Sequence, residues 1–185
     1  MNMNSQGMQV VDFGESTKDM KDYLHVTIEW REPVKWFNIN NLDDDYFEKG
    51  SFIYVITQEH GNRVKSDTIV YIGITERGLA RGFNEKHSSK FKKTNGTYIT
   101  FGFLISDQKT KLRNQGRSAL EELEHILIWA LWSEHELWNE LKIQSLPGWG
   151  VNGTQAWHIK NQGYEFAGRM PEEIIYPWMV VKFKS

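Results

Sequence analysis

The chain has 185 residues, of which 39% are hydrophobic and 25% charged, and this composition is ordinary for one globular domain with a sizeable core. It has no cysteine, which excludes disulfides and cysteine-based zinc sites and fits a cytoplasmic location. The longest unbroken apolar run, Ile126 to Trp132, is too short to span a bilayer, and residues 1–14 lack a signal-peptide pattern, so no membrane partner is expected.

The formal net charge of −2 does not by itself indicate a nucleic-acid partner, but the distribution of charge does. From Arg77 to Arg117 the chain carries ten lysines and arginines against two acids. A basic middle inside a mildly acidic chain is what a phosphate-contacting face can look like, and solvated loop and helix charges are the alternative. The candidate DNA contacts are Arg77, His87, Lys90, Lys92 and Lys93.

Runs with alternating polarity, or rich in β-branched and aromatic residues, predict strands along the chain. In chain order they are Tyr23–Trp30, Val34–Ile39, Phe52–Thr57, Thr68–Ile74, Tyr98–Ile105, Ala156–Ile159 and Tyr176–Phe183. Helices are predicted from Gly78 to about Phe91, and from Ser118, which caps the helix, to about Leu141. Pro177 places the last strand at a sheet edge.

The two predicted strands that carry Tyr54 and Tyr71 are apolar on both faces, as is typical of strands in the middle of a covered sheet. The polar connection between them contains Gly61-Asn62, which is a hairpin signal. We therefore expect Tyr54 and Tyr71 on adjacent antiparallel strands. Gly73, at the end of the second strand, would let another backbone or a phosphate approach closely because it has no Cβ.

Glu124 is the most informative single residue. Helical spacing puts it on one face with Leu120, Leu127, Ile128 and Leu131. A carboxylate on an apolar face needs a partner, since burying it unpaired is costly. A metal ion would serve, and so would a buried arginine or lysine, and the helix geometry leaves both interpretations open.

Arg81, in the predicted helix after the Tyr71 strand, could hold a phosphate or neutralise a transition state. Its alternative is a surface ion pair with Glu85 four residues later. Tyr54 and Tyr71 could be plain core aromatics, or could help to deprotonate a water near a metal. His87 does not share a helical face with Arg81 and is either solvated or in contact with phosphate.

Together these positions resemble the GIY-YIG nuclease family. Phe52-Ile53-Tyr54 stands where the first motif is expected, and Tyr71-Ile72-Gly73 matches the second. Arg81 falls at the distance where the family has its catalytic arginine. Glu124, in the pattern Glu-x-x-Leu-Ile, matches the family's metal-binding glutamate. The resemblance covers roughly residues 50–141.

The resemblance implies a DNA endonuclease that hydrolyses phosphodiester bonds with one divalent metal, Mg²⁺ or Mn²⁺, held by Glu124. It further implies that Tyr54 acts as general base, that Tyr71 positions the attacking water, and that Arg81 stabilises the pentavalent phosphate. The four catalytic residues would thus be Tyr54, Tyr71, Arg81 and Glu124.

The chain departs from the family pattern at several positions. Phe52 stands where glycine is usual, and the interval between Tyr54 and Tyr71 is longer than typical. Glu85 occupies the position where some members carry a histidine. An asparagine usually follows the metal-binding glutamate, and Asn139 lies slightly beyond that distance. The last two departures concern accessory residues and not the metal site.

The expected fold is α+β, with a small, central, mainly antiparallel sheet of three core strands flanked by helices. One domain would span residues 1–185, with the nuclease core at 46–141. The N-terminal extension (1–45) and the C-terminal extension (142–185) would contain strands and supply target recognition or dimer contacts. A double-strand cutter with one small site usually acts as a homodimer, for which the sequence shows no interface signature.

Two other function classes compete with the endonuclease. One is a catalytically silent GIY-YIG-like module that only binds nucleic acid. The other is a protein whose Trp-rich C-terminal region binds a ligand or a partner. Both nucleic-acid classes predict DNA binding that weakens steeply with salt, and the third predicts no such binding.

Overall fold

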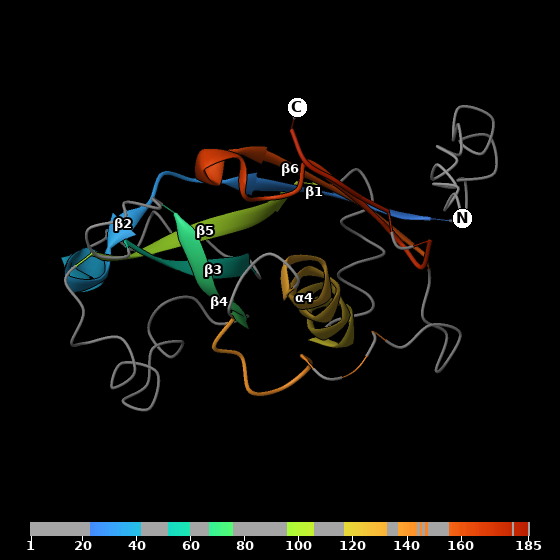
Figure 1. The fold of residues 1–185 in the computed structure, drawn as a ribbon, viewed down its shortest axis with the longest axis horizontal. Coiled ribbons are helices and arrows are strands. Elements are labelled where there is room, and N and C mark those ends of the chain that lie inside the picture. The colour runs from blue at the N-terminus through green and yellow to red at the C-terminus, as the bar shows by residue number, and fades with distance from the viewer. Residues whose placement is uncertain are drawn as a thin grey trace, which may run out of the picture.

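The described part of the chain is mostly β-sheet, as the computed structural model shows (Figure 1). The structure describes residues 23–41, 52–59, 67–75, 96–105, 117–132, 137–143, 145, 147, 156–178 and 180–184. The strands are β1 (Leu24–Trp30), β2 (Val34–Lys35), β3 (Phe52–Gln58), β4 (Thr68–Thr75), β5 (Thr97–Ile105), β6 (Trp157–Gly163), β7 (Glu173–Tyr176) and β8 (Val180–Lys182). The helical elements are α4 (Arg117–Trp132) and the 3₁₀ turns η2 (Trp36–Asn41) and η4 (Phe166–Gly168).

All eight strands belong to one curled, mixed sheet in the order β4-β3-β5-β1-β6-β7-β8, with β2 paired to β5. The β1–β6 pair is parallel and the remaining pairs are antiparallel. β4 ends the order on one side and β8 on the other. Strands β3 and β4 are adjacent and antiparallel, as the sequence predicts for the strands that carry Tyr54 and Tyr71.

The predicted fold class is wrong. The sheet has eight strands and not three, and α4 is the one α-helix among the described residues, so helices do not flank a small sheet. The cause is long-range pairing: β1 lies between β5 and β6, so the strands of both predicted extensions complete the central sheet. The predicted helix from Gly78 to Phe91 and the hairpin tip at Gly61-Asn62 lie outside the described residues.

Apolar side chains cover both faces of the middle of the sheet. On one face, Ile53 and Val55 of β3 belong to the core cluster that includes the buried side of α4. On the other face, Tyr54 and Ile56 pack with residues of η2. The prediction that β3 is covered on both sides is therefore confirmed, and Figure 1 shows α4 against one face of the sheet. The prediction that the Tyr71 strand also lies in the middle of the sheet is wrong, because β4 ends the strand order.

Three element boundaries differ from the sequence predictions. The second strand ends at Lys35, because Trp36 and Ile39 are spaced to bury the same side of a helical turn, and both are buried. The last predicted strand, Tyr176–Phe183, contains β8, but its first residue is the end of β7, and a turn at Pro177 separates the two strands. The rest of β7 was not predicted. Helix α4 ends at Trp132, and residues 137–143 are not helical.

A chain of polar contacts crosses the outer side of β1, β6, β7 and β8. His25 and His158 are register partners on the parallel pair, and their Nδ1 atoms are 3.0 Å apart. His158 Nε2 lies 2.6 Å from Glu173 Oε1, and Lys182 Nζ lies 2.5 Å from Glu173 Oε2. These contacts therefore connect β1 with β6, which is far from it in the sequence, and β6 with β7 and β8.

Replacing His158 by glutamine should reduce the loss of unfolding free energy that the protein shows as the pH falls below about 6.5. Burial is the main cause that lowers the pKa of His158, against the opposing effects of Glu173, and His25 and Lys160 lower it further. The unfolded chain therefore takes up a proton below pH about 6.5 more readily than the folded chain does, and stability falls as the pH drops from there. Urea unfolding at pH 7 and pH 5 should show a smaller loss for the variant than for the wild type. An equal loss in both proteins would contradict this prediction.

Candidate functional site

The ring of Tyr54 lies across strand β4 at Gly73. These two residues are register partners in the β3–β4 pair. A Cβ added at Gly73 would lie 2.4 Å from Tyr54 Cζ and 2.5 Å from its hydroxyl oxygen. The close approach predicted at Gly73 is therefore made by the Tyr54 side chain, and not by a backbone or a phosphate. Since β4 ends the strand order, the Tyr54 hydroxyl lies over the edge strand of the sheet.

Tyr71 stacks beside Tyr54 on the same face of the sheet. In the register, Tyr71 lies opposite Ile56, one pleat repeat away from the Tyr54–Gly73 pair, so the two tyrosines are diagonal neighbours. Their ring centroids are 6.1 Å apart and their planes differ by 27°. Their hydroxyls are hydrogen-bonded, with Tyr54 as the donor. The two phenols thus form one unit.

Burial and a neighbouring carboxylate hold both phenols in their protonated form. Burial is the largest cause that raises the pKa of Tyr54 well above its ordinary value, and the charges of Tyr71 and Glu124 raise it further. For Tyr71, burial and Glu124 raise the pKa, and the hydrogen bond from Tyr54 opposes the rise. The Glu124 carboxylate is therefore close enough to act on both hydroxyls, and a cation on Glu124 would ease the loss of a phenol proton.

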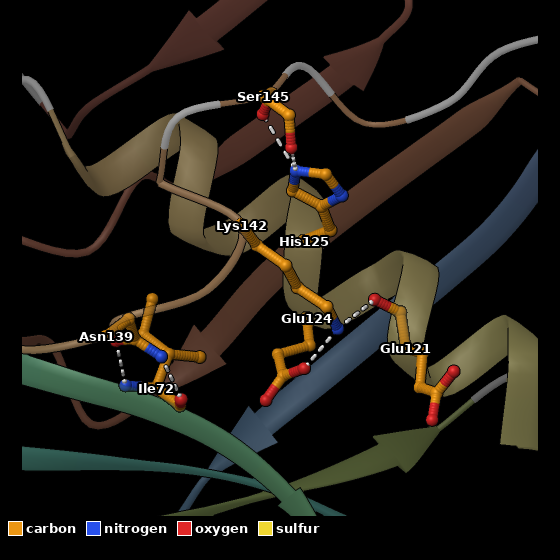
Figure 2. Close-up of polar contacts among 7 residues, drawn as sticks. All are labelled: Ile72, Glu121, Glu124, His125, Asn139, Lys142 and Ser145. Carbon is orange, nitrogen blue, oxygen red and sulfur yellow. Dashed lines mark hydrogen bonds and ion pairs between the residues drawn. The ribbon is translucent and has the colours of Figure 1, made fainter.

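Glu124 lies on helix α4, and its carboxylate forms an ion pair with Lys142 (Figure 2). Lys142 Nζ lies 2.5 Å from Glu124 Oε2 and also donates a 2.9 Å hydrogen bond to the backbone carbonyl of Glu121. The exposed fractions of the two side chains are 26% for Lys142 and 14% for Glu124. Of the two open interpretations of Glu124, the structure contains the lysine partner.

Residues 138–143, which we call the edge strap, pair with the outer edge of β4. The backbone N–H of Trp138 donates to the Val70 carbonyl at 2.6 Å. The Asn139 side chain accepts from the Ile72 N–H at 3.1 Å and donates to the Ile72 carbonyl at 2.8 Å. These bonds satisfy backbone groups of the edge strand and hold Lys142 beside Glu124. Figure 2 shows this arrangement.

Replacing Asn139 by alanine should lower the free energy of unfolding by about 2 kcal/mol or more, because two buried backbone groups of Ile72 lose their partner. Urea unfolding measures the loss. Asn161→Ala is the matched control: this asparagine of β6 also accepts and donates one bond each, from the Trp30 indole and to the Pro171 carbonyl. Both variants should lose stability, and only Asn139→Ala should release Lys142. A loss below about 0.5 kcal/mol for Asn139→Ala would contradict the clamp.

Of the four predicted catalytic residues, Tyr54 and Tyr71 are stacked neighbours on β3 and β4, and Glu124 on α4 is near enough for its charge to raise the pKa of both. Arg81 lies outside the described residues, as do the candidate DNA contacts Arg77, His87, Lys90, Lys92 and Lys93. Sequence reasoning missed the roles of Lys142 and Asn139. It allowed a lysine partner for Glu124 in general, but it predicted helix to about Leu141 and so gave no reason for the chain to return to β4 or to bring Lys142 to Glu124.

Glu124 could supply one carboxylate ligand to a magnesium or manganese ion, although its Oε2 is paired with Lys142. Within the described segments, no three histidine, aspartate or glutamate side chains gather at one point. Mg²⁺ does not require such a cage, since it keeps several waters and is usually bound by one or two carboxylates together with substrate phosphates. The single half-buried carboxylate of Glu124 is compatible with this mode of Mg²⁺ binding.

No family model, curated protein or solved structure matches this chain at a significant level. Among the described residues, no helix is long and apolar enough to cross a membrane. The functional argument therefore depends on the cluster itself.

Proposed function

We propose that this protein is a divalent-metal-dependent DNA endonuclease whose site is built from Tyr54, Tyr71 and Glu124. The observation that supports the proposal is the stacked pair of Tyr54 and Tyr71 at the sheet edge, with the Glu124 carboxylate near enough for its charge to raise the pKa of both. They come from two adjacent strands and a helix, in the chain order that the resemblance to GIY-YIG nucleases implies. The proposal depends on these residues and not on the predicted small fold.

The resemblance assigns Tyr54 the role of general base and Tyr71 the role of positioning the attacking water. Tyr54 must first lose its phenol proton, which its burial and the charge of Glu124 oppose and a cation on Glu124 would favour. Arg81 stabilises the charge on the pentavalent phosphate. Mg²⁺ or Mn²⁺ on Glu124 supplies Lewis-acid stabilisation of the phosphate oxygens and lowers the pKa of a bound water. The basic stretch that includes Arg77, His87, Lys90, Lys92 and Lys93 contacts the DNA backbone.

One observation favours a second candidate. Lys142 already neutralises Glu124, which is what a module without a metal would need in order to keep this carboxylate half-buried. The alternative is therefore a catalytically silent nucleic-acid-binding module. It retains salt-sensitive DNA affinity and lacks cleavage.

Cleavage of supercoiled plasmid tests the proposal. The protein is incubated with Mg²⁺ or Mn²⁺, with EDTA as control, and DNA binding is measured at low and high salt. Metal-dependent nicking or linearisation supports the endonuclease. Salt-sensitive binding without cleavage supports the silent module. Neither cleavage nor binding would overturn both nucleic-acid functions and turn attention to the Trp-rich C-terminal region.

A further inference from the structure

Lys142 is built into the candidate site and does not merely lie near it. Its ammonium group bridges the Glu124 carboxylate and the Glu121 backbone carbonyl of the same helix. With 26% of the Lys142 side chain and 14% of the Glu124 side chain exposed, the pair is more sheltered than a surface ion pair. The chain has therefore placed a positive charge on the one carboxylate that the endonuclease proposal assigns to the metal.

The backbone at Lys142 supports a functional placement. Its φ is +69°, in the left-handed region that side chains other than glycine, asparagine and aspartate rarely adopt. Such a conformation costs of order 1–3 kcal/mol and persists where the surroundings impose it. Here the Asn139 clamp on Ile72 fixes the edge strap three residues earlier, and the helix carbonyl fixes the ammonium group.

The positive charge of Lys142 opposes the binding of a divalent cation to Glu124. A divalent cation that binds Glu124 must displace the ammonium from Oε2 or share the carboxylate with it, and two cations on one carboxylate repel each other. A hydrogen bond between charged groups has to be given up or weakened in either case. The lysine therefore lowers the affinity of the free protein for the metal.

We propose that Lys142 is the resident counter-cation of the metal site, which occupies Glu124 in the metal-free protein and sets how tightly a divalent cation binds there. This inference rests on the proposed function of Glu124 as the metal ligand. Lys142 is accordingly a positioning and regulatory residue for the site, and it competes with the metal for the Glu124 carboxylate.

The test measures Mn²⁺ binding to the full chain without DNA, from the electron paramagnetic resonance signal of free Mn²⁺. Lys142→Met keeps the length of the side chain and removes the charge, and it should tighten Mn²⁺ binding by about tenfold or more. Lys142→Arg keeps the charge, so its Mn²⁺ affinity should stay closer to wild type than that of Lys142→Met. Lys182→Met is the matched control, because Lys182 forms a 2.5 Å pair with Glu173 away from this site.

Two further variants test whether a change in Mn²⁺ binding comes from the lost charge and depends on Glu124. Lys142→Asn also removes the charge and suits the left-handed backbone, so it should tighten Mn²⁺ binding even if the methionine variant folds poorly. In the double variant Glu124→Gln/Lys142→Met, the gain should disappear. Unchanged or weaker Mn²⁺ binding in both single variants, or a gain that survives the loss of Glu124, would overturn the inference.

The plasmid assay separates this inference from the proposed function. Metal-dependent cleavage by the wild type, together with Lys142 variants that do not bind Mn²⁺ more tightly, would overturn the counter-cation role alone. Tighter Mn²⁺ binding that depends on Glu124, in a protein that cleaves no DNA, would support the counter-cation role and overturn the endonuclease.

Discussion

Replacing Glu124 by alanine is expected to abolish metal-dependent DNA cleavage and to leave the fold intact. A metal contributes several kcal/mol to the stabilisation of the transition state, so its loss should lower the cleavage rate by at least about a thousandfold. The free energy of unfolding should change by no more than about 1 kcal/mol, because the Lys142 side chain can turn its ammonium to water. Plasmid cleavage and urea unfolding of the same preparation measure the two effects.

Glu121→Ala is the matched control for this prediction. Glu121 lies one turn earlier on α4, and the atom that it supplies to Lys142 is its backbone carbonyl oxygen, which alanine also has. This variant should cleave at a rate close to wild type. Wild-type cleavage by Glu124→Ala would remove Glu124 from the metal site, and equal losses in both variants would point to a general effect on the helix.

Local sequence patterns predict the strands well because alternation and β-branched content are properties of neighbouring residues. Strands β1, β3, β4 and β5 lie within a residue or two of their predicted bounds. The pairing of β1 with β6 joins residues that are 133 positions apart in the case of His25 and His158, and no local pattern encodes that pairing. The strands of the small sheet were therefore predicted correctly, but the pairing that adds β1 and β6 to them was not.

The end of α4 shows how a tertiary contact overrides a helical pattern. Apolar residues continue past Trp132 at helical spacing, which predicts helix to about Leu141. The chain instead leaves the helix, and Asn139 uses its amide to pair with the exposed edge of β4. An edge strand with unpaired backbone groups gains more from that pairing than the chain loses at the helix end.

Much of the candidate site could be predicted, because its tyrosines are positioned by strand register and its glutamate by helical spacing. The antiparallel neighbours Tyr54 and Tyr71 follow from the two apolar strands and the turn signal between them. Lys142 could not be predicted as the partner of Glu124, since its place depends on the edge strap and on a left-handed backbone that favours no lysine.

Replacing Gly73 by alanine is expected to cost about 3 kcal/mol of stability, at the upper end of what an extra methyl group costs in a packed core. The new Cβ would lie 2.4 Å from Tyr54 Cζ, and the Tyr54 side chain is only 3% exposed and stacked on Tyr71, so it has little room to move. The displaced hydroxyl should also lower plasmid cleavage by about a hundredfold, as misplacement of a reacting group by about 1 Å does.

A double-mutant cycle with Tyr54 tests whether the contact between the new Cβ and the Tyr54 ring causes the loss of stability. In the Tyr54→Ala background the ring is gone, so Gly73→Ala should cost less than about 0.5 kcal/mol, and the two substitutions should couple by about 2–3 kcal/mol. In the Tyr54→Phe background Cζ remains, so Gly73→Ala should cost nearly as much as in the wild type. If Gly73→Ala is equally costly in all three backgrounds, the glycine serves the backbone of β4 and not the placement of Tyr54. If only the alanine background tolerates it, the glycine of the Tyr-Ile-Gly segment makes room for the Tyr54 ring of the neighbouring strand.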